Sequence, residues 1–108
     1  MTDVMKGLYE VVQDRRDHPQ EGSYTCYLLD TGLDKILKKV GEESAETIIA
    51  AKNGSKPEIV GEVGDLLYHL MVMLVSCDVP LEDIIAELEK RSLKTGNLKQ
   101  FKVTDKNT

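Results

Sequence analysis

The chain has 108 residues, enough for one domain with a core and too few for two. Hydrophobic residues make up 41% of it, aromatic residues only 5%, and tryptophan is absent, a composition that suits packed helices better than a sheet sandwich. The net charge of -5 argues against broad nucleic-acid binding, which needs a basic face, but it does not exclude one small anionic substrate held through a metal ion.

Apolar residues at helical spacing predict a first helix over residues 2–14. Residues 15–25 interrupt the pattern, because His18-Pro19 disfavours a helix and Gly22 supplies a turn. The segment is either a solvated linker or a stretch that contacts phosphate. Its arginine and hydroxyl side chains are Arg15, Arg16, Ser23, Tyr24 and Thr25.

A second helix is predicted over residues 31–52, with its apolar stripe centred on Leu33 and Ala51. Asn53-Gly54 ends it, in the usual place for a left-handed residue. A third helix over residues 56–77 begins at a capping box, Ser55-Lys56-Pro57-Glu58. Its stripe, centred on Val63, widens almost all round toward the C-terminal end. Such a helix must be covered on nearly every side, so we expect a homodimer.

A fourth helix is predicted over residues 79–92, with Pro80 near its first turn. Residues 95–108 are polar and lysine-rich and are expected to form a tail outside a helical domain of residues 1–94. No β-alternation is present. The predicted fold is all-α, a bundle of four to five helices.

Several features indicate a soluble, cytoplasmic protein without a membrane partner. No basic and apolar leader pattern opens the chain. The longest apolar run, Leu66 to Val75, is shorter than the ~18 residues that a membrane span needs. Cys26 and Cys77 lack C-x-x-C spacing and are expected to be free thiols in a reducing compartment.

Two acidic clusters lie in the second and third predicted helices, Glu42-Glu43-x-x-Glu46 and Glu62-x-x-Asp65. At ~100° per residue, four of these carboxylates are offset to the same side of their apolar stripes, whereas Glu42 points nearly opposite its stripe. Equal offsets on two facing antiparallel helices fall on one side of the hairpin. Glu43, Glu46, Glu62 and Asp65 are therefore expected to converge.

Four converging carboxylates would repel one another unless a cation lay among them. An all-oxygen ligand set favours Mg²⁺, or Mn²⁺, over zinc. Because Mg²⁺ also binds substrate phosphates, the pattern indicates hydrolysis of a phosphoanhydride in a small nucleotide. The alternative is two solvated, glutamate-rich helix faces. His69 lies in the same angular band and either supports the site or is an ordinary hydrogen-bonded histidine of the bundle.

With its E-E-x-x-E and E-x-x-D pattern, the sequence resembles the all-α nucleotide pyrophosphohydrolases, the MazG-like superfamily. More closely, it resembles the phosphoribosyl-ATP pyrophosphohydrolases of histidine biosynthesis over roughly residues 5–93. The matching stretches are Gly22-Ser23-Tyr24-Thr25, Lys38-Lys39-Val40-Gly41-Glu42-Glu43, Asp65-Leu66-Leu67-Tyr68-His69 and the segment from Leu81 to Arg91.

This resemblance implies Mg²⁺-dependent hydrolysis of phosphoribosyl-ATP to phosphoribosyl-AMP and pyrophosphate by a cytoplasmic dimer, the second step of the pathway. The implied catalytic residues are Glu42, Glu43, Glu46, Glu62 and Asp65. All but Glu42 would bind the metal ion, and Glu42 would lie outside the ligands or orient the attacking water. Lys39 would contact a phosphate. The weaker candidates for substrate binding are Ser23, Tyr24, Thr25, His69 and Arg91.

Two other functions remain open. A housecleaning pyrophosphatase of the same group would act on non-canonical or deoxynucleoside triphosphates. The segments Ser23-Tyr24-Thr25 and Asp65-Leu66-Leu67-Tyr68-His69 favour the histidine-pathway enzyme over it. A helical interaction module without catalysis is the more distant alternative.

Overall fold

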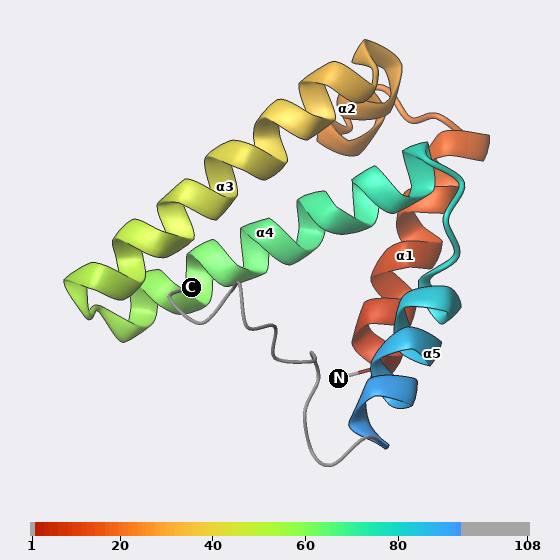
Figure 1. Cartoon of the computed structure of the whole chain (residues 1–108). Helices are drawn as coiled ribbons and strands as arrows, with labels where there is room; N and C mark the ends of the chain where they lie inside the picture. The colour runs from red at the N-terminus through yellow and green to blue at the C-terminus, as the bar shows by residue number, and fades with distance from the viewer. Residues whose placement is uncertain (1, 94–108) are drawn as a thin grey trace.

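The computed structural model describes residues 2–93, and over this range it contains five α-helices and no strand (Figure 1). The all-α prediction with four to five helices is confirmed. The predicted polar tail and its boundary at residue 94 lie outside the described residues. In chain order the helices are α1 (Thr2–Asp17), α2 (Tyr24–Thr31), α3 (Leu33–Asn53), α4 (Lys56–Ser76) and α5 (Leu81–Ser92).

The two longest helices, α3 and α4, form an antiparallel hairpin and share the most extensive helix–helix contact of the described chain (Figure 1). Gly54 ends α3 in the left-handed conformation, with φ 74°, as the sequence predicts. Ser55 then caps α4, because its hydroxyl oxygen accepts a hydrogen bond from the Glu58 amide at 3.4 Å. This two-residue connection fixes α3 and α4 as direct neighbours.

The core lies where α1 crosses the C-terminal half of α4 (Figure 1). The Tyr9 hydroxyl on α1 donates to the Val79 carbonyl at 2.8 Å and ties α1 to the connection between α4 and α5. Burial of apolar surface from all five described helices stabilises this end of the molecule. The largest fully buried side chains are Val12, Leu28, Ile36, Val72 and Val75.

The interruption predicted over residues 15–25 is shorter than expected. Helix α1 continues to Asp17, and α2, which the periodicity did not reveal, begins at Tyr24. The Ser23 hydroxyl oxygen caps α2 by accepting a hydrogen bond from the Cys26 amide at 3.1 Å. Leu28 of α2 is fully buried in the core. With only eight residues, about two turns, α2 is too short to show a clear apolar repeat.

The buried face of α3 also differs from the expected one. Leu33, Leu37, Ile48 and Ala51 of the predicted stripe are exposed in the single chain, whereas Ile36 at its edge is fully buried. Burial instead follows Ile36, Glu43 and Ala50, seven residues apart, on a line rotated by about 80°. The predicted stripe is apolar, but its centre lies beside the buried face of α3 and not on it, because α4 and α2 cover the neighbouring side of that helix.

Helix α4 is long and apolar enough to cross a membrane, judged by length and composition alone. Only 28% of that stretch is buried within the single chain. Its C-terminal half, however, supplies Met71, Val72 and Val75 to the core. Its N-terminal half carries Glu62 and Asp65, each with a carboxylate oxygen within 4.8 Å of one from Glu43 on α3. In this fold α4 is therefore the central helix of the bundle.

Candidate active site

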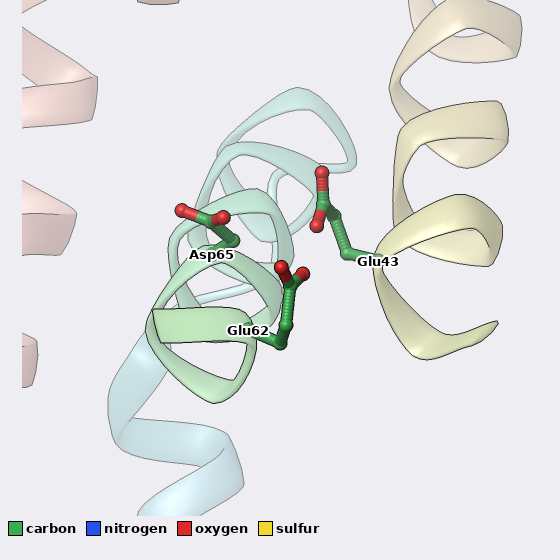
Figure 2. Close-up of side chains that lie close together, drawn as sticks. All are labelled: Glu43, Glu62 and Asp65. Atoms are coloured by element: carbon green, nitrogen blue, oxygen red, sulfur yellow. The ribbon is translucent and has the colours of Figure 1, made fainter. Parts of the chain in front are cut away.

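Three carboxylates from two helices converge in the hairpin. Glu43 reaches from α3 toward Glu62 on α4, and Asp65 lies three residues further along α4 (Figure 2). One oxygen from each residue lies within 4.8 Å of the other two. The shared side of the hairpin that the acidic spacing predicts is confirmed for these three residues.

The three residues differ in burial, since Glu43 is buried, Glu62 is half-buried and Asp65 is exposed. Glu43 is only 6% exposed, although it is an acidic residue. Within residues 2–93, the buried side-chain polar atoms that lack a hydrogen-bond partner are Glu43 Oε2 and Glu62 Oε2. Unpaired carboxylate oxygens are costly in a protein interior, and a bound cation would satisfy both. The all-oxygen donor set suits a hard divalent ion such as Mg²⁺.

Glu46 lies outside this group of three but next to it. A hydrogen bond shared with Glu46, followed by burial and the charges of Glu43 and Asp65, raises the pKa of Glu62 to about 7. The two side chains can share a hydrogen bond only if one of them is protonated. Without a cation, a proton therefore relieves part of the repulsion here. Glu46 is exposed, and its predicted role as a ligand remains a prediction.

Lys39 provides positive charge at the edge of the site. Its Nζ lies 3.4 Å from Glu42 Oε1 and 3.6 Å from Glu43 Oε1. Burial lowers the pKa of Lys39, but the neighbouring Tyr24, Glu42 and Glu43 outweigh this effect and leave the pKa above its ordinary value. Lys39 is therefore a cation held next to the carboxylates. Glu42 faces outward, as the sequence predicts, and its side chain is 46% exposed.

A chain of hydrogen bonds links Asp65 to α2. The Asp65 carbonyl accepts a hydrogen bond from His69 Nδ1 at 2.7 Å, which fixes the proton of a neutral imidazole on Nδ1. His69 Nε2 then accepts from the Tyr24 hydroxyl at 3.1 Å. His69 is 5% exposed, so the ring is held firmly. The structure thus shows how a histidine of the bundle connects the acidic residues to the Ser23-Tyr24-Thr25 segment.

A second contact joins α2 and α4. The hydroxyls of Thr25 and Tyr68 share a hydrogen bond, and the rings of Tyr24 and Tyr68 lie 6.2 Å apart. Tyr68 belongs to the stretch Asp65-Leu66-Leu67-Tyr68-His69 that carries the family resemblance, but the sequence does not predict it as a site residue. Its partner lies 43 positions away, so only the fold shows the contact.

The other predicted substrate-binding residues have different positions. Ser23 is occupied as the cap of α2. Arg91 lies on α5, which is separate from α3 in Figure 1, and its Nε donates to Glu87 Oε2 at 2.9 Å. The structure does not bring Arg91 to the carboxylates of its own chain. A role for Arg91 in substrate binding remains a prediction.

Comparisons with known proteins identify the family of the chain. The family model described as phosphoribosyl-ATP pyrophosphohydrolase matches residues 5–92. The chain is 52% identical to a phosphoribosyl-ATP pyrophosphatase of Clostridium botulinum over 94% of this chain and 92% of that protein. It is 53% identical to one of Streptococcus thermophilus over 94% and 99% of the two chains.

A third relative is longer. The chain is 56% identical to the histidine biosynthesis bifunctional protein HisIE of Caldanaerobacter subterraneus, over 85% of this chain and 45% of that protein. The family match covers every helix that contributes to the acidic site. The chain therefore belongs to the phosphoribosyl-ATP pyrophosphohydrolase family.

Proposed function

We propose that this protein hydrolyses phosphoribosyl-ATP to phosphoribosyl-AMP and pyrophosphate, the second step of histidine biosynthesis. The observation that carries the proposal is the convergence of Glu43, Glu62 and Asp65 within a chain of this family. In the reaction, water attacks a phosphorus atom of the bridge between the α- and β-phosphates, and the bridging P–O bond breaks. Phosphoribosyl-AMP and pyrophosphate leave, and the water gives up a proton. The relatives named phosphoribosyl-ATP pyrophosphatase support this substrate.

We further propose that Glu43, Glu62 and Asp65 hold Mg²⁺ or Mn²⁺, with Glu46 as the neighbouring fourth carboxylate. The unpaired oxygens of Glu43 and Glu62 support this assignment. When bound, the ion would neutralise charge on the phosphates and lower the pKa of a bound water. Lys39 adds positive charge at the edge of the acidic site. There a phosphate oxygen could replace Glu42 as the partner of the Lys39 ammonium group.

The remaining residues have positioning and proton-handling roles in this proposal. Glu42 is exposed beside Lys39 and can accept a hydrogen bond from the attacking water. Without the ion, Glu46 and Glu62 can hold a proton between them at neutral pH, and binding of the ion would release that proton. The Tyr24–His69 pair holds the backbone carbonyl of Asp65 and so limits movement of this part of the site.

The direct test is pyrophosphate release with Mg²⁺ from phosphoribosyl-ATP and from a panel of nucleoside triphosphates. We expect turnover of phosphoribosyl-ATP and a loss of activity when the metal is chelated. Turnover of dCTP or dUTP without turnover of phosphoribosyl-ATP would indicate a housecleaning pyrophosphatase. No turnover of any substrate would favour an interaction module.

We propose that the functional unit is a homodimer. The single chain leaves an apolar surface on the α3–α4 hairpin uncovered, with Ile48 69%, Val60 73% and Val63 36% exposed. Its radius of gyration is 16.0 Å, whereas a compact chain of 100 residues has about 13 Å. A second copy packed on the hairpin would bury this surface and add residues beside the carboxylates.

Light scattering after size exclusion tests the dimer. We expect twice the mass of one chain at micromolar concentration, and a shift toward one chain for Val63→Glu, which places a charge on the apolar surface. A monomeric wild-type protein would contradict the proposal. We also propose that the protein is soluble and works in the cytoplasm.

A further inference from the structure

A groove of about 760 Å³ lies between the end of α1 and α2, outside the three-carboxylate site. Two arginines and two tyrosines line it, with Asp30, Cys26 and uncharged side chains completing the walls. None of the functional roles above uses the groove as a whole. Its lining of cations and aromatic rings suits a ligand that carries both a phosphate and an aromatic base.

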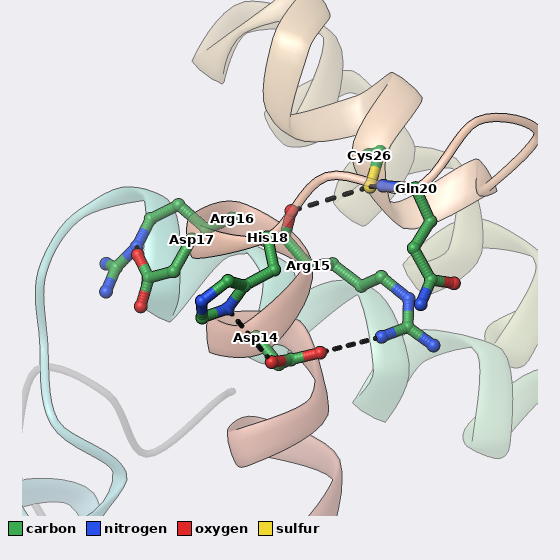
Figure 3. A network of polar contacts seen from close by, with 7 residues as sticks. All are labelled: Asp14, Arg15, Arg16, Asp17, His18, Gln20 and Cys26. Atoms are coloured by element: carbon green, nitrogen blue, oxygen red, sulfur yellow. Dashed lines mark hydrogen bonds and ion pairs between the residues drawn. The ribbon is translucent and has the colours of Figure 1, made fainter.

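Arg15 is the cation best placed to bind an anion there. Its Nη1 donates to Asp14 Oδ2 at 3.0 Å, which uses one of the five guanidinium donors. Figure 3 shows its side chain reaching toward that of Gln20, below Cys26. Arg16 is more fully engaged, since it contacts both Asp17 and Asp78. Arg15 therefore keeps donors for a phosphate on the groove side.

The aromatic wall has exposed ring surface for a base. Tyr24 and Tyr27 are 46% and 51% exposed, and their ring centroids lie 6.2 Å apart with planes 25° from parallel. Aromatic faces of this kind stack on nucleobases. Asp30, also in the lining, can accept a hydrogen bond from a ribose hydroxyl.

Tyr24 connects this groove to the acidic site. Its ring lines the groove, whereas its hydroxyl is bonded to His69 and through that ring to Asp65. Along α4, Glu62, Asp65 and His69 follow one another at intervals of about one turn, or ~5 Å. The order in space is therefore carboxylates, then His69 and Tyr24, then the groove with Arg15.

The chemistry of the proposed substrate has the same order. Phosphoribosyl-ATP carries its triphosphate on one ribose, then the adenine base, then a second ribose with its own phosphate. With the triphosphate at the carboxylates, the base reaches the tyrosines and the second phosphate lies beyond them. We propose that the groove binds the phosphoribosyl group of the substrate and that Arg15 contacts its phosphate. This inference rests on the proposed function.

Two nucleotides that differ only in this group, phosphoribosyl-AMP and AMP, provide the test. Inhibition constants for phosphoribosyl-AMP and for AMP are measured with wild type and with Arg15→Ala. We expect the variant to bind phosphoribosyl-AMP about 10- to 100-fold more weakly, because a charge-assisted hydrogen bond is lost, and to bind AMP unchanged. For phosphoribosyl-ATP, KM should rise more than kcat falls.

Two further variants control for charge and for structure. Arg15→Lys keeps the charge but not the two-pronged geometry and should recover part of the affinity. Lys52→Ala removes an exposed cation at the far end of α3 and should leave both constants unchanged. Circular dichroism checks that each variant is folded.

The outcomes separate this inference from the proposed function. Equal weakening of AMP and phosphoribosyl-AMP by Arg15→Ala, or no weakening of either, would overturn the assignment of the groove. A wild-type protein that releases no pyrophosphate from phosphoribosyl-ATP would instead overturn the proposed function.

Discussion

The two halves of α4 have different surroundings and different roles. In the C-terminal half, Met71, Val72 and Val75 are buried among α1, α2 and α3. In the N-terminal half, Glu62 and Asp65 face Glu43 across the hairpin, and the apolar Val60 remains exposed. One half holds the fold together and the other holds charges in positions that cost stability. Substitutions in the two halves should therefore separate activity from stability.

The largest expected effect is on activity, in the N-terminal half. Asp65→Asn removes one negative charge at the proposed cation and leaves the side-chain volume unchanged. We expect kcat/KM for phosphoribosyl-ATP to fall on the order of 100- to 1000-fold, while helicity is retained. Pyrophosphate release and circular dichroism measure the two quantities. Asp34→Asn, an exposed acid in the first turn of α3, is the matched control. Near-full activity of Asp65→Asn would refute the metal assignment.

The next effect is on stability, in the C-terminal half. Val72 is fully buried, so Val72→Ala removes packed methyl groups and leaves a small cavity. We expect the free energy of unfolding to fall by about 2 kcal/mol and Tm by about 10 °C. At a temperature where the variant is folded, its kcat/KM should match wild type.

The control is Val4→Ala on α1, where the side chain is 73% exposed and little change is expected. Thermal unfolding and pyrophosphate release measure both variants. If Val72→Ala lost activity while fully folded, the separation between the two halves of α4 would not hold.

The smallest effect is the dependence of stability on pH and magnesium. The pKa of Glu62, about 7 in the folded chain, is above the ordinary carboxyl value of 4.5. The metal-free folded state therefore binds a proton at Glu62 more tightly than the unfolded state does. As the pH rises from about 4.5 to 7, the contribution of Glu62 to the free energy of unfolding falls. Magnesium needs the carboxylate form, so its stabilising effect should be larger at pH 8 than at pH 6.

Unfolding temperatures at both pH values, with Mg²⁺ and with a chelator, measure this difference. Glu62→Gln removes the titrating group and should abolish most of the difference in the magnesium effect between pH 6 and pH 8. A magnesium effect that is equal at pH 6 and pH 8 in wild type would argue against a proton on Glu62 competing with the ion.

Much of this protein follows from local sequence. The helical repeats placed four of the helices to within a few residues. Ser55 and Gly54 marked the hairpin, because capping and left-handed turns depend on residues near in the chain. The spacing of the acidic residues was enough to bring Glu43, Glu62 and Asp65 together, since a hairpin of two straight helices is a simple geometry.

Tertiary structure decided the rest. The sequence showed an apolar stripe on α3 but not which side would be covered, and packing against α2 and α4 buried the side with Ile36 and Glu43 instead. It did not reveal α2, because eight residues hold too little periodicity and Leu28 is stabilised by partners on other helices. The contact between Tyr24 and His69 joins residues 45 positions apart. Local propensity carries no information on such pairs, so only the folded chain could connect the acidic site to the groove.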